Sequence, residues 1–133
     1  MSDIGFIGLG NMGAALARRL LTQHTLHVWD LNPAATDALV EEGAVAANGP
    51  GGVGASGAEL IITCLPTSAQ VEEVIFGTDG VADTLGEGAL IADMTTGDPL
   101  ATKAMAARLA ERGINMIDAP VSGGRAKAVD GSL

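Results

Sequence analysis

The chain has 133 residues, of which 47% are hydrophobic and only 2% aromatic, so it can form one domain with a core of small aliphatic side chains. Its 16 Asp and Glu outnumber its 7 Lys and Arg, and the net charge of −9 argues against nucleic acids and anionic membranes as partners. One cysteine and two histidines are too few for a disulfide framework or a zinc site, and no targeting segment is recognisable, which predicts a cytoplasmic protein.

Apolar runs of strand length alternate with helical stretches in the first half of the chain. Residues 4–8 form a continuous apolar run, typical of a parallel strand that is covered on both faces. Met12, Leu16 and Leu20 recur every four residues, which predicts a helix, and Asn32-Pro33 has the composition of a helix start. The predicted elements are strands over 4–8, 26–30 and 44–47, and helices over 11–22 and 32–42.

The second half of the chain repeats this alternation. The run 59–65 (ELIITCL) predicts a strand that is stopped by Pro66, with Cys64 inside it as a small core residue. The glycine-rich stretch 49–57 lies between two strands, and we expect a surface loop or a frayed short helix there rather than a domain boundary. The remaining predicted elements are strands over 89–93 and 114–117, and helices around 71–75 and 101–109.

Two successive β-α-β-α-β units predict an α/β fold, with a parallel sheet and helices on both of its faces. Because crossovers between parallel strands are right-handed, the doubly wound Rossmann topology with strand order 3-2-1-4-5-6 is favoured. Such sheets bind ligands beyond the carboxyl ends of the strands, where the strand order reverses. We therefore expect a site at the ends of the first and fourth strands.

A glycine motif of the form G-x-G-x-x-G, Gly8-Leu9-Gly10-Asn11-Met12-Gly13, lies between the first predicted strand and the first predicted helix. In a dinucleotide site, Gly8 permits the tight turn, Gly10 lets the backbone approach a pyrophosphate, and Gly13 lets helix and strand pack closely. The N–H groups at the helix start would then bind the phosphates. The alternative is that the glycines serve only a sharp strand-to-helix turn.

An acidic residue, Asp30, ends the second predicted strand. A carboxylate at this position can accept hydrogen bonds from both ribose hydroxyls of NAD, and it would repel the 2′-phosphate of NADP. The next residues, Leu31 and Asn32, supply no Arg that could receive a phosphate. The sequence therefore predicts NAD as the cofactor, with a merely solvated acid as the alternative.

Three further segments should open on the same edge of the sheet. Leu65-Pro66 ends the fourth predicted strand, Thr95-Thr96 follows the fifth, and Ser122-Gly123-Gly124 follows the sixth. Each segment also has a purely structural interpretation, which is strand termination, capping of the next helix and an ordinary turn, respectively. The hydroxyl and exposed N–H groups of the last segment would form a small anion receptor.

The segments GFIGLGNMGAALARRL, LPTSAQVEEVIFG, DMTTGDP and DAPVSGGRAKAVDGSL together resemble the β-hydroxyacid dehydrogenases, a family that includes 3-hydroxyisobutyrate dehydrogenase and tartronate semialdehyde reductase. The resemblance implies that residues 8–13 and Asp30 bind NAD and that Ser122, Gly123 and Gly124 bind the carboxylate of the substrate. It also implies a nicotinamide side lined by Leu65, Pro66, Gln70 and Thr96. One departure is Arg125, where many members have a small or apolar residue.

The resemblance also concerns what this chain does not contain. Family members continue into a helical second domain, which supplies a catalytic lysine in a G-x-G-x-x-x-K-x-x-N pattern that is absent here. Neither Lys103 nor Lys127 occupies that position, so the resemblance implies that the family lysine lies beyond Leu133. We expect residues 1–133 to be the cofactor domain of a longer, homo-oligomeric NAD-dependent enzyme for a small β-hydroxyacid, with no catalytic residue of its own. The alternative is a dinucleotide-binding sensor or interaction module without catalysis.

Overall fold

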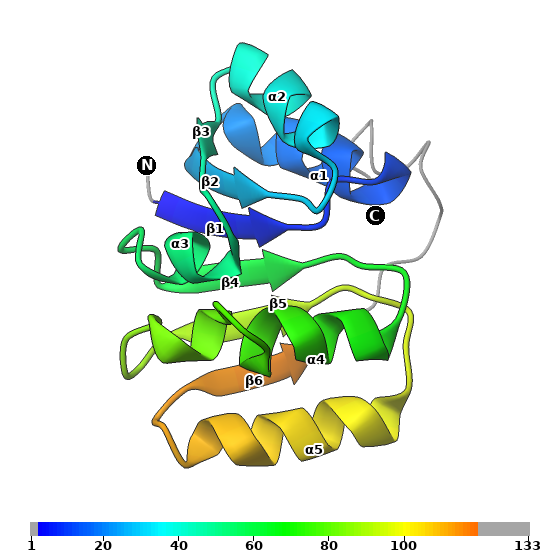
Figure 1. The fold of residues 1–133 in the computed structure, drawn as a ribbon, viewed down its shortest axis with the longest axis vertical. Helices are drawn as coiled ribbons and strands as arrows, with labels where there is room; N and C mark the ends of the chain where they lie inside the picture. The colour runs from blue at the N-terminus through cyan, green and yellow to red at the C-terminus, as the bar shows by residue number, and fades with distance from the viewer. Residues whose placement is uncertain (1–2, 120–133) are drawn as a thin grey trace.

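One parallel sheet between two layers of helices makes up residues 3–119, the part of the chain that the computed structural model describes (Figure 1). The six strands lie in the order β3-β2-β1-β4-β5-β6, so the predicted doubly wound topology is confirmed. The elements in chain order are β1 (Asp3–Ile7), α1 (Asn11–Leu21), β2 (Thr25–Trp29), α2 (Pro33–Glu41), β3 (Val45–Ala46), α3 (Pro50–Gly54), β4 (Leu60–Thr63), α4 (Ser68–Phe76), the 3-10 helix η1 (Val81–Asp83), β5 (Leu90–Asp93), α5 (Pro99–Ala110) and β6 (Asn115–Asp118).

The central strand β1 joins the two halves of the sheet. Ile4 is in register with Leu26 of β2 on one side and with Leu60 of β4 on the other, and both pairings are parallel. Because side chains alternate along a strand, Phe6 and Ile7 enter different cores on the two faces of the sheet. A strand buried on both faces needs a continuous apolar run, which is what residues 4–7 supply.

Each face of the sheet is covered by its own set of helices. One core contains Val53 of α3, Ile75 of α4 and Leu109 of α5, all fully buried against the sheet. The other core contains Ala17 of α1 and Leu39 of α2, packed on strands β1 and β2. Figure 1 shows α3, α4 and α5 on the near side, with α1 behind the sheet.

The glycine-rich stretch after β3 forms a short helix, one of the two forms expected for it, and the alternative of a surface loop is wrong. Residues Pro50–Gly54 form the short helix α3, and four of its five residues are buried. The glycines allow α3 to lie directly on the residues that flank η1. The Gly51 N–H donates to the Asp79 carbonyl at 2.8 Å before η1, and a Cβ on Gly54 would overlap Thr84 Oγ1 after it. The composition that resembles a linker therefore reflects close packing.

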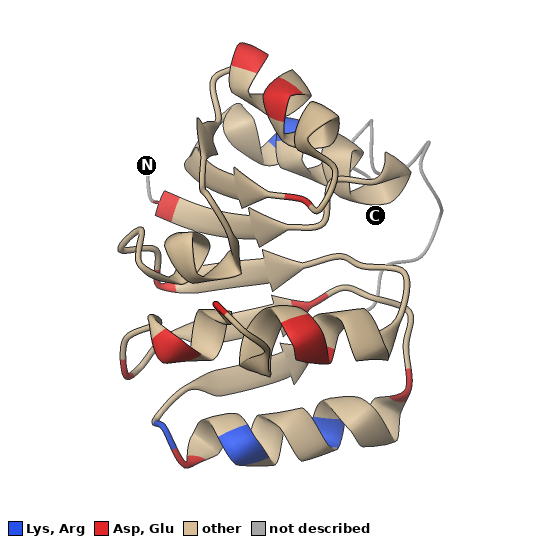
Figure 2. Ribbon diagram, viewed as in Figure 1, with Lys and Arg blue, Asp and Glu red and all other residues tan. Residues whose placement is uncertain are grey.

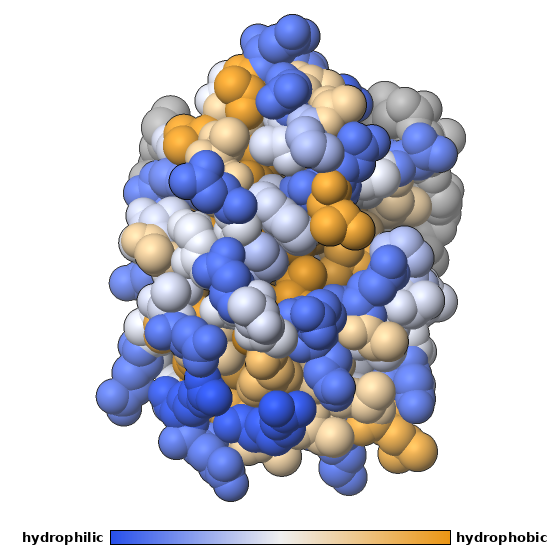
Figure 3. Space-filling view, in the orientation of Figure 1, coloured by the Kyte–Doolittle hydropathy of each residue, from blue (hydrophilic) through white to orange (hydrophobic). Residues whose placement is uncertain are grey.

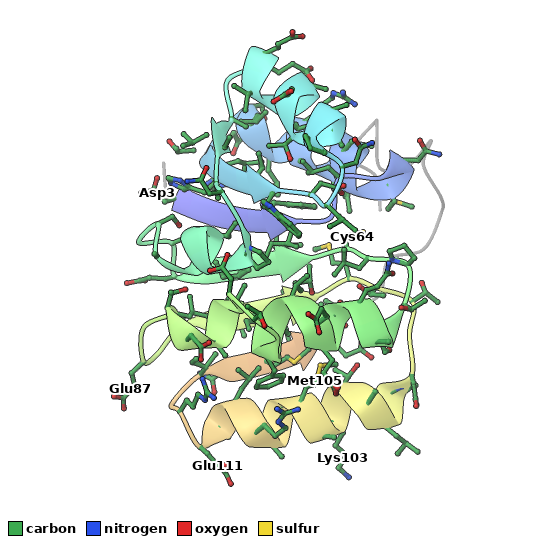
Figure 4. The ribbon with its side chains drawn as sticks, viewed as in Figure 1. Asp3, Cys64, Glu87, Lys103, Met105 and Glu111 are labelled. Atoms are coloured by element: carbon green, nitrogen blue, oxygen red, sulfur yellow. The ribbon has the colours of Figure 1, made fainter. Side chains whose placement is uncertain are left out.

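The end of β4 also differs from the expectation. The ladder stops at Thr63, so Cys64 and Leu65 lie just beyond it, and both are half-buried rather than part of the strand core. Figure 4 shows Cys64 where the chain leaves β4. This early end places two residues that the sequence assigned to the sheet at the edge where a ligand would bind.

Candidate functional site

A cleft of about 650 Å³ opens at the carboxyl ends of β1, β2 and β4, where the strand order reverses. In Figure 3 apolar side chains gather in a hollow between α2 and α4, in this region of the surface. The residues that line the cleft are Gly8, Gly10, Asn11, Met12, Gly13, Trp29, Asp30, Leu31, Asn32, Cys64, Leu65, Pro66, Gln70, Glu73 and Val74.

The surroundings that favour glycine differ among Gly8, Gly10 and Gly13. Gly8 has φ of +103°, and a Cβ there would overlap the Cys64 carbonyl; a Cβ on Gly13 would overlap the carbonyl of Gly8. Gly10 has φ of −70°, and a Cβ on it would meet no heavy atom within 4 Å. The fold therefore needs glycine at positions 8 and 13, whereas at position 10 the space beside the backbone is open to a ligand.

The start of α1 faces this open space. Gly10 is the N-cap of the helix and supplies no side-chain hydrogen bond, so the first-turn N–H groups have no capping side chain. Aligned peptide dipoles place partial positive charge at a helix N-terminus. Together these features form an anion-binding site suited to a pyrophosphate.

The carboxylate of Asp30 is fixed at the rim of the cleft by its own neighbourhood. Oδ2 accepts a hydrogen bond from the Leu9 N–H at 2.6 Å, and Oδ1 accepts one from the Asn32 N–H at 2.8 Å. The backbone N–H of Asp30 donates to Thr36 Oγ1 at 3.1 Å. Each carboxylate oxygen retains capacity for a further donor, so Asp30 can accept hydrogen bonds from hydroxyl groups of a ligand.

Charge in the cleft is one-sided. Asp30 and Glu73 are acidic, and the described lining includes no Lys or Arg. In Figure 2 the basic segments of this view lie on α1, on α5 and in the turn after α5. A bound phosphate would therefore rely on backbone N–H groups and the helix dipole, and an additional phosphate beside Asp30 would find no described cation.

The opposite wall of the cleft is the segment between β4 and α4. Leu65 and Pro66 line it, and the Leu65 N–H donates to Thr95 Oγ1 at 2.9 Å. Capping by Thr95 or Thr96 is wrong as an alternative, because Asp98 caps α5 by accepting from the Leu100 N–H at 3.0 Å. Thr95 instead connects the end of β5 with the wall of the cleft.

Cys64 lines the cleft and also packs against the core of the α1 face, so the prediction of a core residue is only partly right. Burial raises the pKa of its thiol, and the charge of nearby Asp93 raises it further. A thiol that stays protonated is a poor nucleophile. Cys64 therefore contributes shape rather than reactivity.

The structure brings most of the residues predicted for the cofactor together. Nine of them line the cleft, whereas Leu9 is buried in the core and reaches Asp30 only through its N–H, and exposed Thr96 is outside the lining. The lining residues that sequence reasoning missed are Trp29, Leu31, Asn32, Cys64, Glu73 and Val74.

Two of the expectations concern positions after residue 119, outside the described range 3–119. One is the substrate carboxylate site at Ser122, Gly123 and Gly124, which lies among these residues. The other is the position of the catalytic lysine, which the resemblance places beyond Leu133, itself outside the described residues. Both therefore stay predictions, and neither enters the geometry of the cleft.

The sequence of this chain is similar to those of known dinucleotide-binding enzymes. Residues 3–133 match the NAD binding domain of 6-phosphogluconate dehydrogenase. The chain belongs to this family. It is 43% identical over its whole length to 3-sulfolactaldehyde reductase of Escherichia coli K12 and 41% identical to NAD-dependent L-serine dehydrogenase of Pseudomonas aeruginosa, and it covers 45% of each protein.

Solved structures of the family have the same fold. 3-Hydroxyisobutyrate dehydrogenase of Salmonella typhimurium matches with a TM-score of 0.89 at 35% identity, over 98% of this chain and 46% of that one. Psf3 bound to NADP+ matches with a TM-score of 0.89 at 34% identity, over 96% of this chain and 45% of that one. The expected resemblance to the hydroxyacid dehydrogenases and the expected NAD-binding domain are confirmed, and the chain spans about 45% of the length of the two curated relatives named above.

Residues 3–119 contain neither a membrane-spanning helix nor a cluster of metal-ligating side chains. No described helix has the length and apolar character to cross a membrane. Among the same residues, no three His, Cys, Asp or Glu side chains cluster so that they could hold a metal ion.

Proposed function

We propose that the chain is the cofactor domain of an NAD-dependent oxidoreductase that interconverts a small β-hydroxyacid, such as 3-hydroxyisobutyrate, and the corresponding semialdehyde. The observation that carries the proposal is the carboxylate of Asp30, which Leu9 and Asn32 hold at the rim of a cleft large enough for a dinucleotide. The relatives support the substrate class, because their names include an L-serine dehydrogenase and a 3-hydroxyisobutyrate dehydrogenase.

The residues present fit the cofactor along its length. The proposed contacts begin with Asp30 at the adenosine ribose and continue through the glycine motif at the pyrophosphate. Leu65, Pro66 and Gln70, which line the cleft, are proposed for the nicotinamide half, together with Thr96, which lies outside the lining. When bound, NAD supplies the hydride acceptor at C4 of its nicotinamide. The role of this chain is to bind the cofactor, to orient it and to exclude water from one side of it.

Asp30 is also the basis for proposing NAD rather than NADP. A 2′-phosphate would lie against a fixed carboxylate, and the described lining offers it no basic side chain. Psf3 shows that the fold itself accepts NADP+, so the preference must come from local residues such as Asp30. We expect a difference of about 1–3 kcal/mol or more in binding free energy, because a desolvated phosphate would be unpaired.

The rest of the proposed reaction concerns residues outside the described part of the chain. The family resemblance supports a substrate carboxylate site at residues 122–124, and it assigns the catalytic lysine to the second domain of family members, beyond Leu133 in the numbering of this chain. Lys103, on α5, is exposed and points away from the sheet in Figure 4, so it is not a candidate for that role. We propose that the whole enzyme is a cytoplasmic homo-oligomer, and that residues 1–133 alone bind cofactor with little turnover.

The test uses Trp29, the single tryptophan of the chain, which lines the cleft and should change its fluorescence when a dinucleotide binds. NAD and NADP are titrated against the chain, and the affinities are checked by calorimetry. We expect saturable NAD binding and at least about fivefold weaker NADP binding. Equal affinities, tighter NADP binding or no NAD binding would contradict the proposal. Robust turnover of β-hydroxyacids by these 133 residues would contradict its division of labour.

A further inference from the structure

A buried carboxylate, Asp93, lies at the end of β5 and is only 1% exposed. Its Oδ1 accepts a hydrogen bond from the Thr63 hydroxyl at 2.9 Å and another from the Thr95 backbone N–H at 3.0 Å. Burial of a carboxylate is unfavourable unless its hydrogen bonds are satisfied. Asp93 does not line the cleft, so its effect on the cleft must pass through the residues that it holds.

Thr95 links Asp93 to the wall of the cleft through hydrogen bonds. Its side chain is 3% exposed, and its Oγ1 accepts the Leu65 N–H at 2.9 Å across the sheet edge. Pro66 has no N–H, so the Leu65 N–H is the last backbone donor before Thr67, the N-cap of α4. The position of the Leu65-Pro66 segment therefore depends on the Thr95 hydroxyl.

The part of the ligand that this wall meets follows from the topology. A dinucleotide with its adenosine ribose at Asp30 and its pyrophosphate at Gly10 crosses the switch point, so its nicotinamide half lies toward Leu65 and Pro66. We propose that Thr95, held by Asp93, is a positioning residue for the nicotinamide half of the cofactor. This inference rests on the proposed function, since it requires NAD in the cleft.

The experiment compares NAD with ADP-ribose, which lacks the nicotinamide. Thr95→Val keeps the shape of the side chain but cannot accept the Leu65 N–H, and Thr95→Ser keeps the hydroxyl. By calorimetric titration of the full chain, we expect Thr95→Val to weaken NAD binding about five- to tenfold and ADP-ribose binding less than about twofold. Thr95→Ser should keep NAD binding within about twofold of the unsubstituted chain.

A matched control is Thr102→Val, which removes another buried threonine hydroxyl. Thr102 of α5 is 7% exposed, donates to the carbonyl of the N-cap residue Asp98 at 3.4 Å and lies outside the cleft lining. We expect it to leave both ligands unaffected. Equal weakening of NAD and ADP-ribose by Thr95→Val, unchanged NAD binding, failure of Thr95→Ser to keep NAD binding, or the same NAD loss in Thr102→Val would each overturn the inference.

Hydrogen exchange on the unsubstituted chain decides the question even if Thr95→Val does not fold. The inference predicts that exchange of the Leu65 amide slows more with saturating NAD than with saturating ADP-ribose. Equal slowing with both ligands would overturn it. A chain that binds ADP-ribose but shows no extra protection thus contradicts only the role of Thr95, whereas a chain that binds neither ligand contradicts the proposed function.

Discussion

Each of the two walls of the cleft is held by a hydrogen bond from a backbone N–H to a buried threonine hydroxyl, but the two bonds span different distances along the chain. On the wall formed by residues 29–32 at the end of β2 (the β2 wall), Asp30 donates its N–H to the buried hydroxyl of Thr36, six residues later. On the wall formed by residues 64–66 between β4 and α4 (the β4 wall), Leu65 donates its N–H to the buried hydroxyl of Thr95, 30 residues later. The β2 wall presents a charged side chain to the cleft, whereas the β4 wall presents apolar side chains and backbone. In the proposed function, recognition of ribose and placement of the nicotinamide half would therefore come from separate parts of the sequence.

The largest effect is expected for the turn at which the two walls meet. Gly8→Ala would force a side chain into positive φ and against the Cys64 carbonyl, so the free energy of unfolding should fall by about 2–5 kcal/mol in denaturant titrations. Gly10→Ala is the matched control, because its Cβ meets only open space, and it should change stability by less than about 1 kcal/mol. We expect Gly10→Ala to weaken NAD binding instead. An unchanged NAD affinity in Gly10→Ala would contradict the presence of a ligand beside Gly10.

Removing the charged group of the β2 wall should have the next largest effect. Asp30→Ala deletes a charged hydrogen-bond acceptor, so NAD binding should lose about 1.5–3 kcal/mol and the preference over NADP should disappear. Asp37→Ala removes the same charge from an exposed position on α2 outside the cleft and should change neither affinity. If calorimetry showed the preference for NAD intact in Asp30→Ala, cofactor selection would have to lie elsewhere.

Thr36→Val separates the two walls more finely. It removes the acceptor of the Asp30 N–H, so NAD and ADP-ribose should both bind about fivefold more weakly, since both contain the adenosine ribose. Thr95→Val, in contrast, should affect NAD alone. Titrations of both variants with both ligands form a complete comparison. The same ligand pattern for both substitutions would mean that the two walls do not act on different halves of the cofactor.

The smallest effect is a pH dependence located at Cys64. Because burial raises the pKa of its thiol, the folded chain keeps this proton at pH values where the unfolded chain has released it. The free energy of unfolding should therefore decrease as the pH rises from the ordinary thiol pKa to the raised one, and Cys64→Ser should lack that part of the slope. Iodoacetamide should modify the folded chain more slowly than the unfolded chain near pH 8, and equal rates would contradict the raised pKa.

Sequence reasoning succeeded where the signal is local. The glycine motif and Asp30 lie on contiguous segments with a fixed spacing, and the alternation of elements was sufficient for the strand order. It also found Leu65 and Pro66, because a proline after an apolar run marks a strand end. The neighbours Trp29, Leu31 and Asn32 could have been added from their position beside Asp30, and Glu73 and Val74 from their spacing of three and four residues after Gln70.

The remaining features depend on pairs that no local pattern reveals. Capping of the next helix was the structural alternative for Thr95, because Ser and Thr favour that role, but the partner of its hydroxyl is 30 residues away. The glycines of α3 allowed either a surface loop or a frayed short helix, and their tertiary contacts with residues 79–84 favour the helix. In both cases tertiary contacts decided between two interpretations that the local sequence allowed.

The central place of β1 has a consequence for the order in which the protein is made. Ile4 pairs with Leu26 and also with Leu60, so one neighbour of β1 is synthesised well after the other. At ribosomal speeds of about 5–20 residues per second, the second partner follows about 3–11 s after β1 itself. During that interval a nascent chain can contain the whole glycine motif and Asp30 without the facing wall. The complete cleft, with both of its walls, can therefore form only once β4 has been made and has left the ribosome.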